Sequence, residues 1–316
     1  MDGKQATRLE DLAKLAGVSI STASRALNDS PAVNTRTKQR IWKLARELDY
    51  PFRHYMPAGP IGADATIAIV VPRPQSRDGR MADPFLFELL AGIGDAARAR
   101  GCDVLLSHIA PSSHEELAAA LSTSRSDGVI FLGQSTLHEA FNRLAETENR
   151  FVVWGAALPE QAYCSVGSDN IAGGRRATQH LARLGRKKLV FLGDTDAPEA
   201  MQRFRGYRDG LERQGLDYAD ERVVPAHFSV ASARAAMDAL INQGDRFDGV
   251  VAASDLIALG AIQALQRSGR RVPEDVSVIG YDNVPFGAYA EVPLSTVDQN
   301  TAKAGRMLVS KLLDAA

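Results

Sequence analysis

The chain has almost none of the features that mark exported, membrane-bound or disulfide-stabilised proteins. No apolar run reaches the roughly 18 residues that a transmembrane helix needs. The first residues are polar and lack the apolar centre of a signal peptide. Only two cysteines occur, Cys102 and Cys164, far apart and without a His or Cys ligand motif around them. We therefore predict a cytoplasmic protein with two buried, unpaired thiols, no metal site and no membrane partner.

The sequence also lacks the short motifs of several enzyme classes. No Gly-x-Gly-x-x-Gly motif follows a predicted strand, and neither a Walker-type phosphate loop nor a Gly-x-Ser-x-Gly nucleophile motif occurs. The nearest catalytic pattern pairs Asp194 with Asp196, as in Mg-dependent phosphatases, but lacks their lysine and second acidic motif. We expect no enzyme activity, no catalytic residue and no cofactor, with the phosphatase kept as an alternative.

What the chain does contain is a pair of short helical patterns around a glycine, at residues 9–28. The first helix has one apolar face, because its nonpolar residues recur at i, i+3, i+4 and i+7: Leu9, Leu12, Ala13 and Ala16. Gly17 suits the chain reversal, and Ser19 suits the N-cap of the second helix. Ala23 and Leu27, four residues apart, are predicted to face the core. This layout is typical of a helix-turn-helix, whose second helix enters the major groove of DNA.

The outward face of the second helix consists of Ile20, Ser21, Ser24 and Arg25, and the helix with its cap holds three serines and a threonine. Serine is a poor helix former but bonds phosphates well, so this composition favours a DNA-contacting face over a merely solvated one. A third helix is predicted from Thr35 to about Leu48, with Asn34 as its N-cap. Its buried stripe would consist of Ile41, Leu44, Ala45 and Leu48.

Charge is divided unevenly along the chain. The whole sequence has 37 Lys and Arg against 38 Asp and Glu, whereas residues 1–60 have ten against six. The first 60 residues therefore carry a net charge of +4 and the remainder −5. A basic head on a mildly acidic body suits local contact with DNA without indiscriminate binding.

From Ala65 onward, apolar strands alternate with amphipathic helices. Strands are predicted at 66–71, 103–107, 128–132, 151–154, 188–192, 222–224, 249–252 and 276–280. Helices are predicted at about 84–100, 114–123, 137–147, 172–184, 199–214, 230–243, 255–268 and 301–314. This alternation indicates an α/β fold with parallel strands covered by helices on both faces. The pattern alone leaves open one large sheet, a barrel and two smaller sheets.

The stretch from Arg8 to Tyr50 resembles the DNA-binding headpiece of the LacI/GalR (lactose repressor) family. The matching residues are Asp11, Ala13, Ala16, Gly17, Val18, Ser19, Thr22, Ser24, Arg25, Leu27, Asn28, Val33, Thr37, Leu48, Asp49 and Tyr50. The resemblance implies that Ile20, Ser21 and Arg25 reach base edges, arginine being suited to a bidentate contact with guanine. It assigns phosphate contacts to Ser19, Thr22, Ser24 and Asn28.

Residues 65–314 resemble the effector-binding core of the same family, which is similar to periplasmic sugar-binding proteins. The resemblance favours two doubly wound subdomains with a ligand cleft between them. It implies three regions: a headpiece at 1–50, a hinge at 51–64 and a core at 65–316. Within the core, the N-terminal subdomain would take about 65–164 and 294–316, and the C-terminal subdomain about 165–293.

Side chains suited to a carbohydrate follow several predicted strands, and in open parallel sheets ligands bind beyond the carboxyl ends of the strands. Arg203 and Asp282 match effector-contacting positions of the family, and a guanidinium and a carboxylate suit vicinal hydroxyls. The resemblance adds Phe85, Phe228 and Ser254 as effector contacts. Each phenylalanine taken alone fits the core better than a ligand site, and Asp282 also suits a turn or a helix cap.

The sequence departs from the family in two places. Family members usually have an amphipathic hinge helix whose leucine wedges into the minor groove of DNA. The corresponding residues 50–60 contain three prolines and a glycine, which leave room for at most one helical turn, so Tyr55 or Met56 would have to replace the leucine. Family cores also commonly continue with one more crossover and a final strand, whereas this sequence ends at Ala316, as a naturally short or truncated core would.

Together these patterns predict a cytoplasmic transcription regulator, in this family most often a repressor, that binds a pseudo-palindromic operator as a homodimer or higher oligomer. A small ligand, best matched by a sugar or sugar derivative, would control its DNA affinity. The other alternative is a sugar-binding protein of the transport type. The polar N-terminus and the attached headpiece argue against that alternative.

Overall fold

The computed structural model describes residues 9–27, 30, 32–47, 65–72, 83–123, 126–244 and 246–314. The chain divides into two compact units, residues 1–61 and residues 62–315. Within the described ranges, no helix is long and apolar enough to cross a membrane. The predicted hinge at 51–64, with Tyr55 and Met56, lies outside the described residues, and so does Asn28. Cys102 is buried as predicted, but the prediction was wrong for Cys164, which is exposed just before the short edge strand Ser165–Val166.

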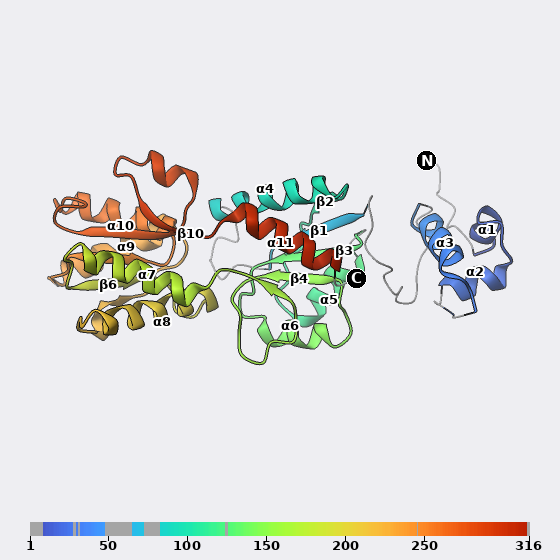
Figure 1. Ribbon diagram of the computed structural model, residues 1–316, viewed down its shortest axis with the longest axis horizontal. Coiled ribbons are helices and arrows are strands. Elements are labelled where there is room, and N and C mark those ends of the chain that lie inside the picture. Colours follow the sequence, from blue (N-terminus) through green and yellow to red (C-terminus); the bar gives the residue numbers. More distant parts are fainter. Residues whose placement is uncertain are drawn as a thin grey trace. The chain divides into compact units, whose positions relative to one another are not determined.

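The first unit is a three-helix domain of α1 (Leu9–Leu15), α2 (Ile20–Leu27) and α3 (Thr35–Glu47) (Figure 1). Its core centres on Leu12, Ala26 and Ile41, none of which is exposed. The indole Nε1 of Trp42 donates to the carbonyl oxygen of Ala26 at 2.8 Å and so ties α3 to α2. The three predicted helices are confirmed, with one change: Ala26 is fully buried, whereas Leu27 is only partly buried.

Local chemistry explains where these helices begin and end. Gly17 has a φ of +61°, in the left-handed region that glycine adopts without strain. The hydroxyl of Ser19 accepts from the backbone N–H of Thr22 at 3.1 Å, and Oδ1 of Asn34 accepts from the N–H of Thr37 at 2.9 Å. Both predicted N-caps are therefore confirmed.

The second unit contains two five-stranded parallel sheets, one in each subdomain (Figure 1). The first sheet has the order β2-β1-β3-β4-β5, with β1 Thr66–Val70, β2 Asp103–Leu106, β3 Gly128–Leu132, β4 Phe151–Trp154 and β5 Ser165–Val166. Helices α4 (Pro84–Ala99) and α11 (Thr301–Asp314) pack side by side on one face of this sheet. Helices α5 (His114–Thr123) and α6 (His138–Ala145) cover the other face.

The second sheet repeats the same topology. Its order is β10-β9-β8-β6-β7, with β6 Leu189–Leu192, β7 Val223–Val224, β8 Gly249–Ala252, β9 Ser277–Asp282 and β10 Ser295–Asp298. Its helices are α7 Asn170–Arg183, α8 Pro198–Arg213, α9 Val230–Asn242 and α10 Asp255–Arg267. If the five strands of each half are numbered in chain order, both sheets have the doubly wound order 2-1-3-4-5. The predicted fold class is therefore confirmed, and a single large sheet and a barrel are excluded.

The subdomain boundaries differ by a few residues from those predicted. The strand Ser165–Val166 pairs with β4 in the first sheet, and Ser295–Asp298 pairs with β9 in the second. The chain therefore leaves the first subdomain after Val166 rather than at 164, and returns to it after Asp298 rather than near 294. Both are short edge strands. Pairing with a neighbouring strand identifies them more clearly than their own residue pattern does.

Two glycines bring α7 and α8 into backbone contact. A Cβ at Gly174 would overlap the carbonyl oxygen of Arg203, and a Cβ at Gly206 would overlap the carbonyl oxygen of Ile171. The absence of both side chains lets α8 approach α7 closely. Arg203 is thereby fixed on the α8 turn that faces α7.

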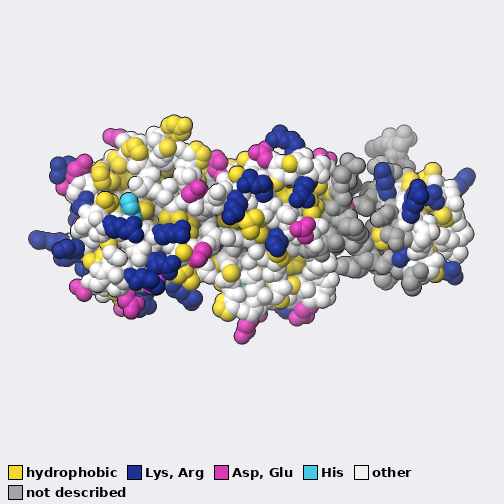
Figure 2. Space-filling model, in the orientation of Figure 1, with side chains coloured by type: hydrophobic (Ala, Val, Ile, Leu, Met, Phe, Trp, Pro, Cys, Tyr) yellow, Lys and Arg dark blue, Asp and Glu magenta, His cyan; other side chains and the backbone are white. Residues whose placement is uncertain are grey.

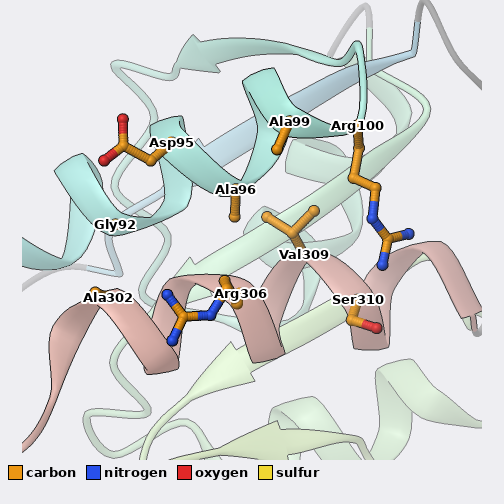
Figure 3. Close-up of a pocket in the computed structure, with 9 residues that line it drawn as sticks. All are labelled: Gly92, Asp95, Ala96, Ala99, Arg100, Ala302, Arg306, Val309 and Ser310. Carbon is orange, nitrogen blue, oxygen red and sulfur yellow. The ribbon is translucent and has the colours of Figure 1, made fainter.

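A surface groove runs between α4 and α11 on the outer side of the first subdomain (Figure 3). Its lining consists of Gly92, Asp95, Ala96, Ala99, Arg100, Ala302, Arg306, Val309 and Ser310. A Cβ at Gly92 would lie 2.5 Å from the carbonyl oxygen of Thr301, so the two helices touch at that end. Figure 2 shows Lys and Arg side chains gathered over α4 and α11, and again over α7 and α8.

Candidate functional site

The first candidate site is the outward face of α2. Ile20 is 50% exposed although it is a large apolar residue, and Ser21 and Arg25 are exposed beside it. Thr22 and Ser24 are half-buried at the margin of this face. The three predicted base-contacting side chains thus share one accessible surface, which is the arrangement that reading a DNA groove requires.

Hydroxyl groups at the start of α2 bond to one another. Ser19 Oγ lies 2.8 Å from Thr22 Oγ1 and 3.0 Å from Ser21 Oγ, in addition to capping the helix. This end of the helix also carries no acidic residue in its first turn. Hydroxyls and free N–H groups at a helix N-terminus favour an anion such as a DNA phosphate.

The second candidate site lies in the core, around the buried Arg203. Its guanidinium is held 3.8 Å above the centre of the Tyr281 ring. Nε donates to Oδ1 of Asn170 at 2.9 Å, and Nη1 donates to the carbonyl oxygen of Ala253. Because Arg203 is only 5% exposed, these contacts fix the cation in one orientation at the carboxyl end of the second sheet.

Asp282 ends β9 directly beside this cation. Its Oδ1 lies 3.8 Å from Nη1 of Arg203 and accepts from Nε2 of Gln299 at 2.7 Å. Burial raises the pKa of Asp282 well above the usual range of an aspartate; the Arg203 cation opposes the rise, and the negative charges of Asp83 and Asp255 add to it. The two residues matched to effector contacts are therefore brought together as a buried charge pair.

The structure adds two carboxylates that the sequence did not single out, Asp83 and Glu199. Asp83 caps α4 by accepting from the N–H of Phe85 at 3.0 Å, and Glu199 lies in the first turn of α8. Burial raises the pKa of both groups, and the Arg203 cation counteracts the rise in each case. One arginine thus faces acidic groups from both subdomains. An acidic residue directly before Pro84, after an apolar strand, was the sequence signal for Asp83.

The other predicted effector contacts have clear packing roles. The Phe85 ring lies 5.7 Å from the Trp154 ring and is buried, and Phe228 is half-buried against the core of the second subdomain. Ser254 is buried and caps α10 by accepting from the N–H of Ile257 at 3.2 Å. It directly follows Ala253, whose carbonyl binds Arg203. For Phe85, Phe228 and Ser254, only the family resemblance points to ligand contact in addition to these packing roles.

The Asp194 and Asp196 pair does not form a two-carboxylate site. Asp194 accepts from Nδ1 of His227 at 2.8 Å and from the backbone N–H of Asp196 at 3.0 Å, while Asp196 is exposed. In the part of the chain that the structure describes, no three His, Cys, Asp or Glu side chains are grouped to hold a metal ion. The paired aspartates therefore serve a turn and a histidine contact.

Another buried carboxylate, Asp255, links the start of α10 to β10. It accepts from the N–H of Val284 at 2.9 Å and from the hydroxyl of Thr296 at 2.6 Å, and it has no exposed surface. Burial raises its pKa from 3.8 to about 6, against the lowering effect of these hydrogen bonds.

This shift predicts a measurable pH dependence of stability. Because the folded pKa of Asp255 lies above the unfolded value, its favourable contribution is complete below about pH 4 and is lost as the pH rises through about 6. Two pKa units correspond to about 3 kcal/mol. Between pH 4 and 7, urea unfolding of wild type is expected to lose up to that amount relative to Asp255→Asn, which does not titrate. Parallel pH profiles of the two proteins would contradict this assignment.

Comparison with known proteins gives consistent matches to both units. A model of the lacI family of bacterial regulatory proteins matches residues 8–51, and a model of a periplasmic binding protein-like domain matches residues 178–316. The HTH-type transcriptional regulator CelR of Thermobifida fusca is 34% identical over 99% of this chain and 93% of its own length. The HTH-type transcriptional repressor PurR of Aliivibrio fischeri (strain MJ11) is 30% identical over 97% of this chain and 90% of its own.

Solved structures agree with the sequence matches. A transcriptional regulator CelR–cellobiose complex aligns with a TM-score of 0.68 at 33% identity, over 98% of this chain and 92% of that one. The lac repressor dimer bound to operator and an anti-inducer aligns with the same TM-score at 24% identity, over the same two shares, which supports the fold.

Proposed function

Because this chain belongs to the LacI family of DNA-binding transcription regulators, we propose that it is a repressor whose affinity for a pseudo-palindromic operator is set by a carbohydrate bound between its core subdomains. The observation that carries the proposal is the buried pair of Arg203 and Asp282, 3.8 Å apart at the carboxyl end of the second sheet. A guanidinium and a carboxylate held this way bind adjacent hydroxyls in two directions, since one donates and the other accepts. Because the same chain carries a helix-turn-helix, ligand binding at this site can change its affinity for DNA.

The charge of the cleft favours a neutral polyol over a phosphorylated ligand. Among the residues that the structure describes, Asp83, Glu199 and Asp282 all interact with the cation of Arg203. Of the described residues, three acidic groups and one arginine would meet a ligand phosphate, whereas sugar hydroxyls donate to carboxylates favourably. The cellobiose found in the complex of the similar CelR is a neutral carbohydrate of this kind. We propose Phe85, Phe228 and Ser254 as further effector-contacting residues on family resemblance.

The DNA-binding role is proposed to require a homodimer, because one headpiece reads only a few base pairs and two related by a twofold axis read a palindrome. The edge strand β2 supports a partner surface, since Val104, Leu105 and Leu106 are each at least 40% exposed and Phe87 of α4 is 51% exposed. An open apolar strand edge is normally covered in a functional protein. A second copy of the chain is the partner that a palindromic operator supplies.

Binding to DNA is consistent with the cytoplasmic location that we propose. We also propose a role without catalysis, because the carboxylates of Asp194 and Asp196 serve a turn and a contact with His227 rather than a phosphatase site. We propose that Ser19, Thr22 and Ser24 contact phosphates and that Ile20, Ser21 and Arg25 contact base edges.

Arg25→Ala is expected to weaken specific operator binding by about 1–3 kcal/mol while leaving binding to random DNA nearly unchanged. The operator would be recovered by selection with the full chain from a random duplex library. Titration at fixed salt, with two copies bound per site, measures the effect. Arg40→Ala on α3 is the matched control, since it removes an exposed arginine outside the α2 face. Equal operator affinity of wild type and Arg25→Ala would remove Arg25 from the base-reading set.

The chemical class of the ligand is tested by thermal unfolding and by the same operator titration. Cellobiose is the first probe, with glucose 6-phosphate as the anionic comparison. We expect the neutral sugar to raise the melting temperature of the full chain and to change its operator affinity. Stabilisation by the phosphorylated sugar alone would overturn the proposed neutral polyol.

A further inference from the structure

Two segments carry the chain between the core subdomains, residues 167–169 and residues 299–300. The first joins β5 to α7, and the second joins β10 to α11. They are 130 positions apart in sequence, yet the hydroxyl of Ser168 donates to Oε1 of Gln299 at 2.7 Å. Any rotation of one subdomain against the other must pass through these segments, and this bond fastens them to each other.

The opposite end of the same amide reaches the cleft. Nε2 of Gln299 donates to Oδ1 of Asp282 at 2.7 Å, and Gln299 is only 8% exposed. The orientation of the amide follows from its partners, because the carboxylate needs a donor and the serine hydroxyl needs an acceptor. One side chain therefore connects both crossing segments to the carboxylate beside Arg203.

Two further contacts run in parallel with this connection. Ser168 Oγ lies 3.3 Å from the hydroxyl of Tyr281, whose ring supports Arg203. Arg203 itself donates to Asn170, the first residue of α7 after the crossing segment. Asp282 and Arg203 thus each form a hydrogen bond with a residue in or next to a crossing segment, Gln299 and Asn170 respectively.

We propose that Gln299 is a positioning residue that transmits occupancy of Asp282 to the angle between the subdomains; the proposal rests on the ligand-controlled function given above. A ligand hydroxyl that donates to Asp282 must share or replace the Gln299 bond. Either event shifts the amide and weakens its hold on Ser168 in the other segment. A ligand can drive the rotation only in this way, by interacting differently with the two arrangements.

The direct test separates ligand affinity from ligand response. Ser168→Ala removes the bond between the crossing segments, together with the longer contacts of Ser168 to Tyr281 and Asn170, and leaves the Gln299–Asp282 bond intact. Gln299→Met removes both bonds of Gln299. Cellobiose affinity is measured by calorimetry, and the change in operator affinity at saturating cellobiose by titration of the full chain. Ser168→Ala is expected to keep cellobiose affinity within about threefold while reducing the change in operator affinity about threefold to tenfold. The double variant should lose no more of this response than Gln299→Met does.

A matched control is Ser165→Ala, which removes a nearby hydroxyl that accepts from Gln161 and does not contact Gln299. It should keep both cellobiose affinity and the response. A full response in Ser168→Ala and Gln299→Met, with both variants folded, would overturn the proposal.

A second measurement needs no ligand. Amide hydrogen exchange of the full chain is expected to accelerate in both crossing segments when either Ser168 or Gln299 is replaced, because each bond restrains two segments distant in sequence. Acceleration confined to the substituted segment would overturn the connection. If wild type does not bind cellobiose, the proposed ligand fails, and this exchange experiment still decides the role of Gln299.

Discussion

Replacing Gly206 by alanine is expected to lower the free energy of unfolding of the core by about 3 kcal/mol. The new Cβ would overlap the carbonyl oxygen of Ile171 in α7 and would also press on the backbone N of Arg175. Backbone atoms inside two packed helices cannot yield as a flexible side chain can, so α8 must move away from α7. Urea unfolding of the full chain, followed by circular dichroism, measures the loss.

Gly94→Ala provides the matched control within α4. No heavy atom lies within 4 Å of the position its Cβ would take, and the residue is helical. The substitution is expected to raise stability by about 0.5–1 kcal/mol, because alanine loses less conformational freedom than glycine on forming a helix. If the two variants changed stability alike, close contact between α7 and α8 would not be the cause.

The same packing also bears on ligand binding. Gly174 lies against the backbone of Arg203, so the distance between α7 and α8 fixes where that guanidinium sits. Gly206→Ala should therefore weaken cellobiose binding as well as stability, although residue 206 has no ligand role of its own. Stability and site geometry are coupled here through a helix crossing.

The elements that could be predicted are those defined by local chemistry. Ser19 and Asn34 act as N-caps because a hydroxyl or amide oxygen placed at that position always meets the same N–H groups. The longer core strands carry continuous apolar runs, which only burial on both faces explains. The strands Ser165–Val166 and Ser295–Asp298 were not predicted, since the first has two residues and the second is largely exposed and polar.

The candidate site was predictable only where a residue pattern matched a known family. Arg203 and Asp282 were named in this way, and the structure brings them together. Asp83, Glu199 and Gln299 were not named from the sequence. Asp83 has a local signal, its place before Pro84 at a helix start, whereas no local pattern distinguishes Glu199 or Gln299. Asp83 acts on Arg203 from 120 positions away, and such proximity is a product of the tertiary fold. Buried polar residues that link two subdomains through hydrogen bonds follow no helical or strand periodicity, so the sequence pattern does not predict them.

Arg203→Met is expected to destabilise the core by about 3–5 kcal/mol at neutral pH and to abolish the response to cellobiose. The substitution keeps an unbranched side chain over Tyr281 but removes the cation that pairs with Asp282, and breaking a buried pair leaves an uncompensated charge. It also leaves the carbonyl oxygen of Ala253 and the amide of Asn170 without their donor.

The pH dependence of this loss identifies its cause. Burial already raises the pKa of Asp282, and removing the cation raises it further, so the variant binds a proton more tightly when folded. Its stability deficit should therefore be smallest in acid and should grow as the pH rises through the folded pKa. Adding Asp282→Asn should recover much of the deficit at neutral pH, because the uncompensated charge is gone, without restoring the ligand response. Asp282→Asn alone should keep operator binding and weaken cellobiose by about 1.5–3 kcal/mol. A deficit that is independent of pH and unaffected by Asp282→Asn would mean that Arg203 stabilises the core through packing and hydrogen bonds rather than through its charge.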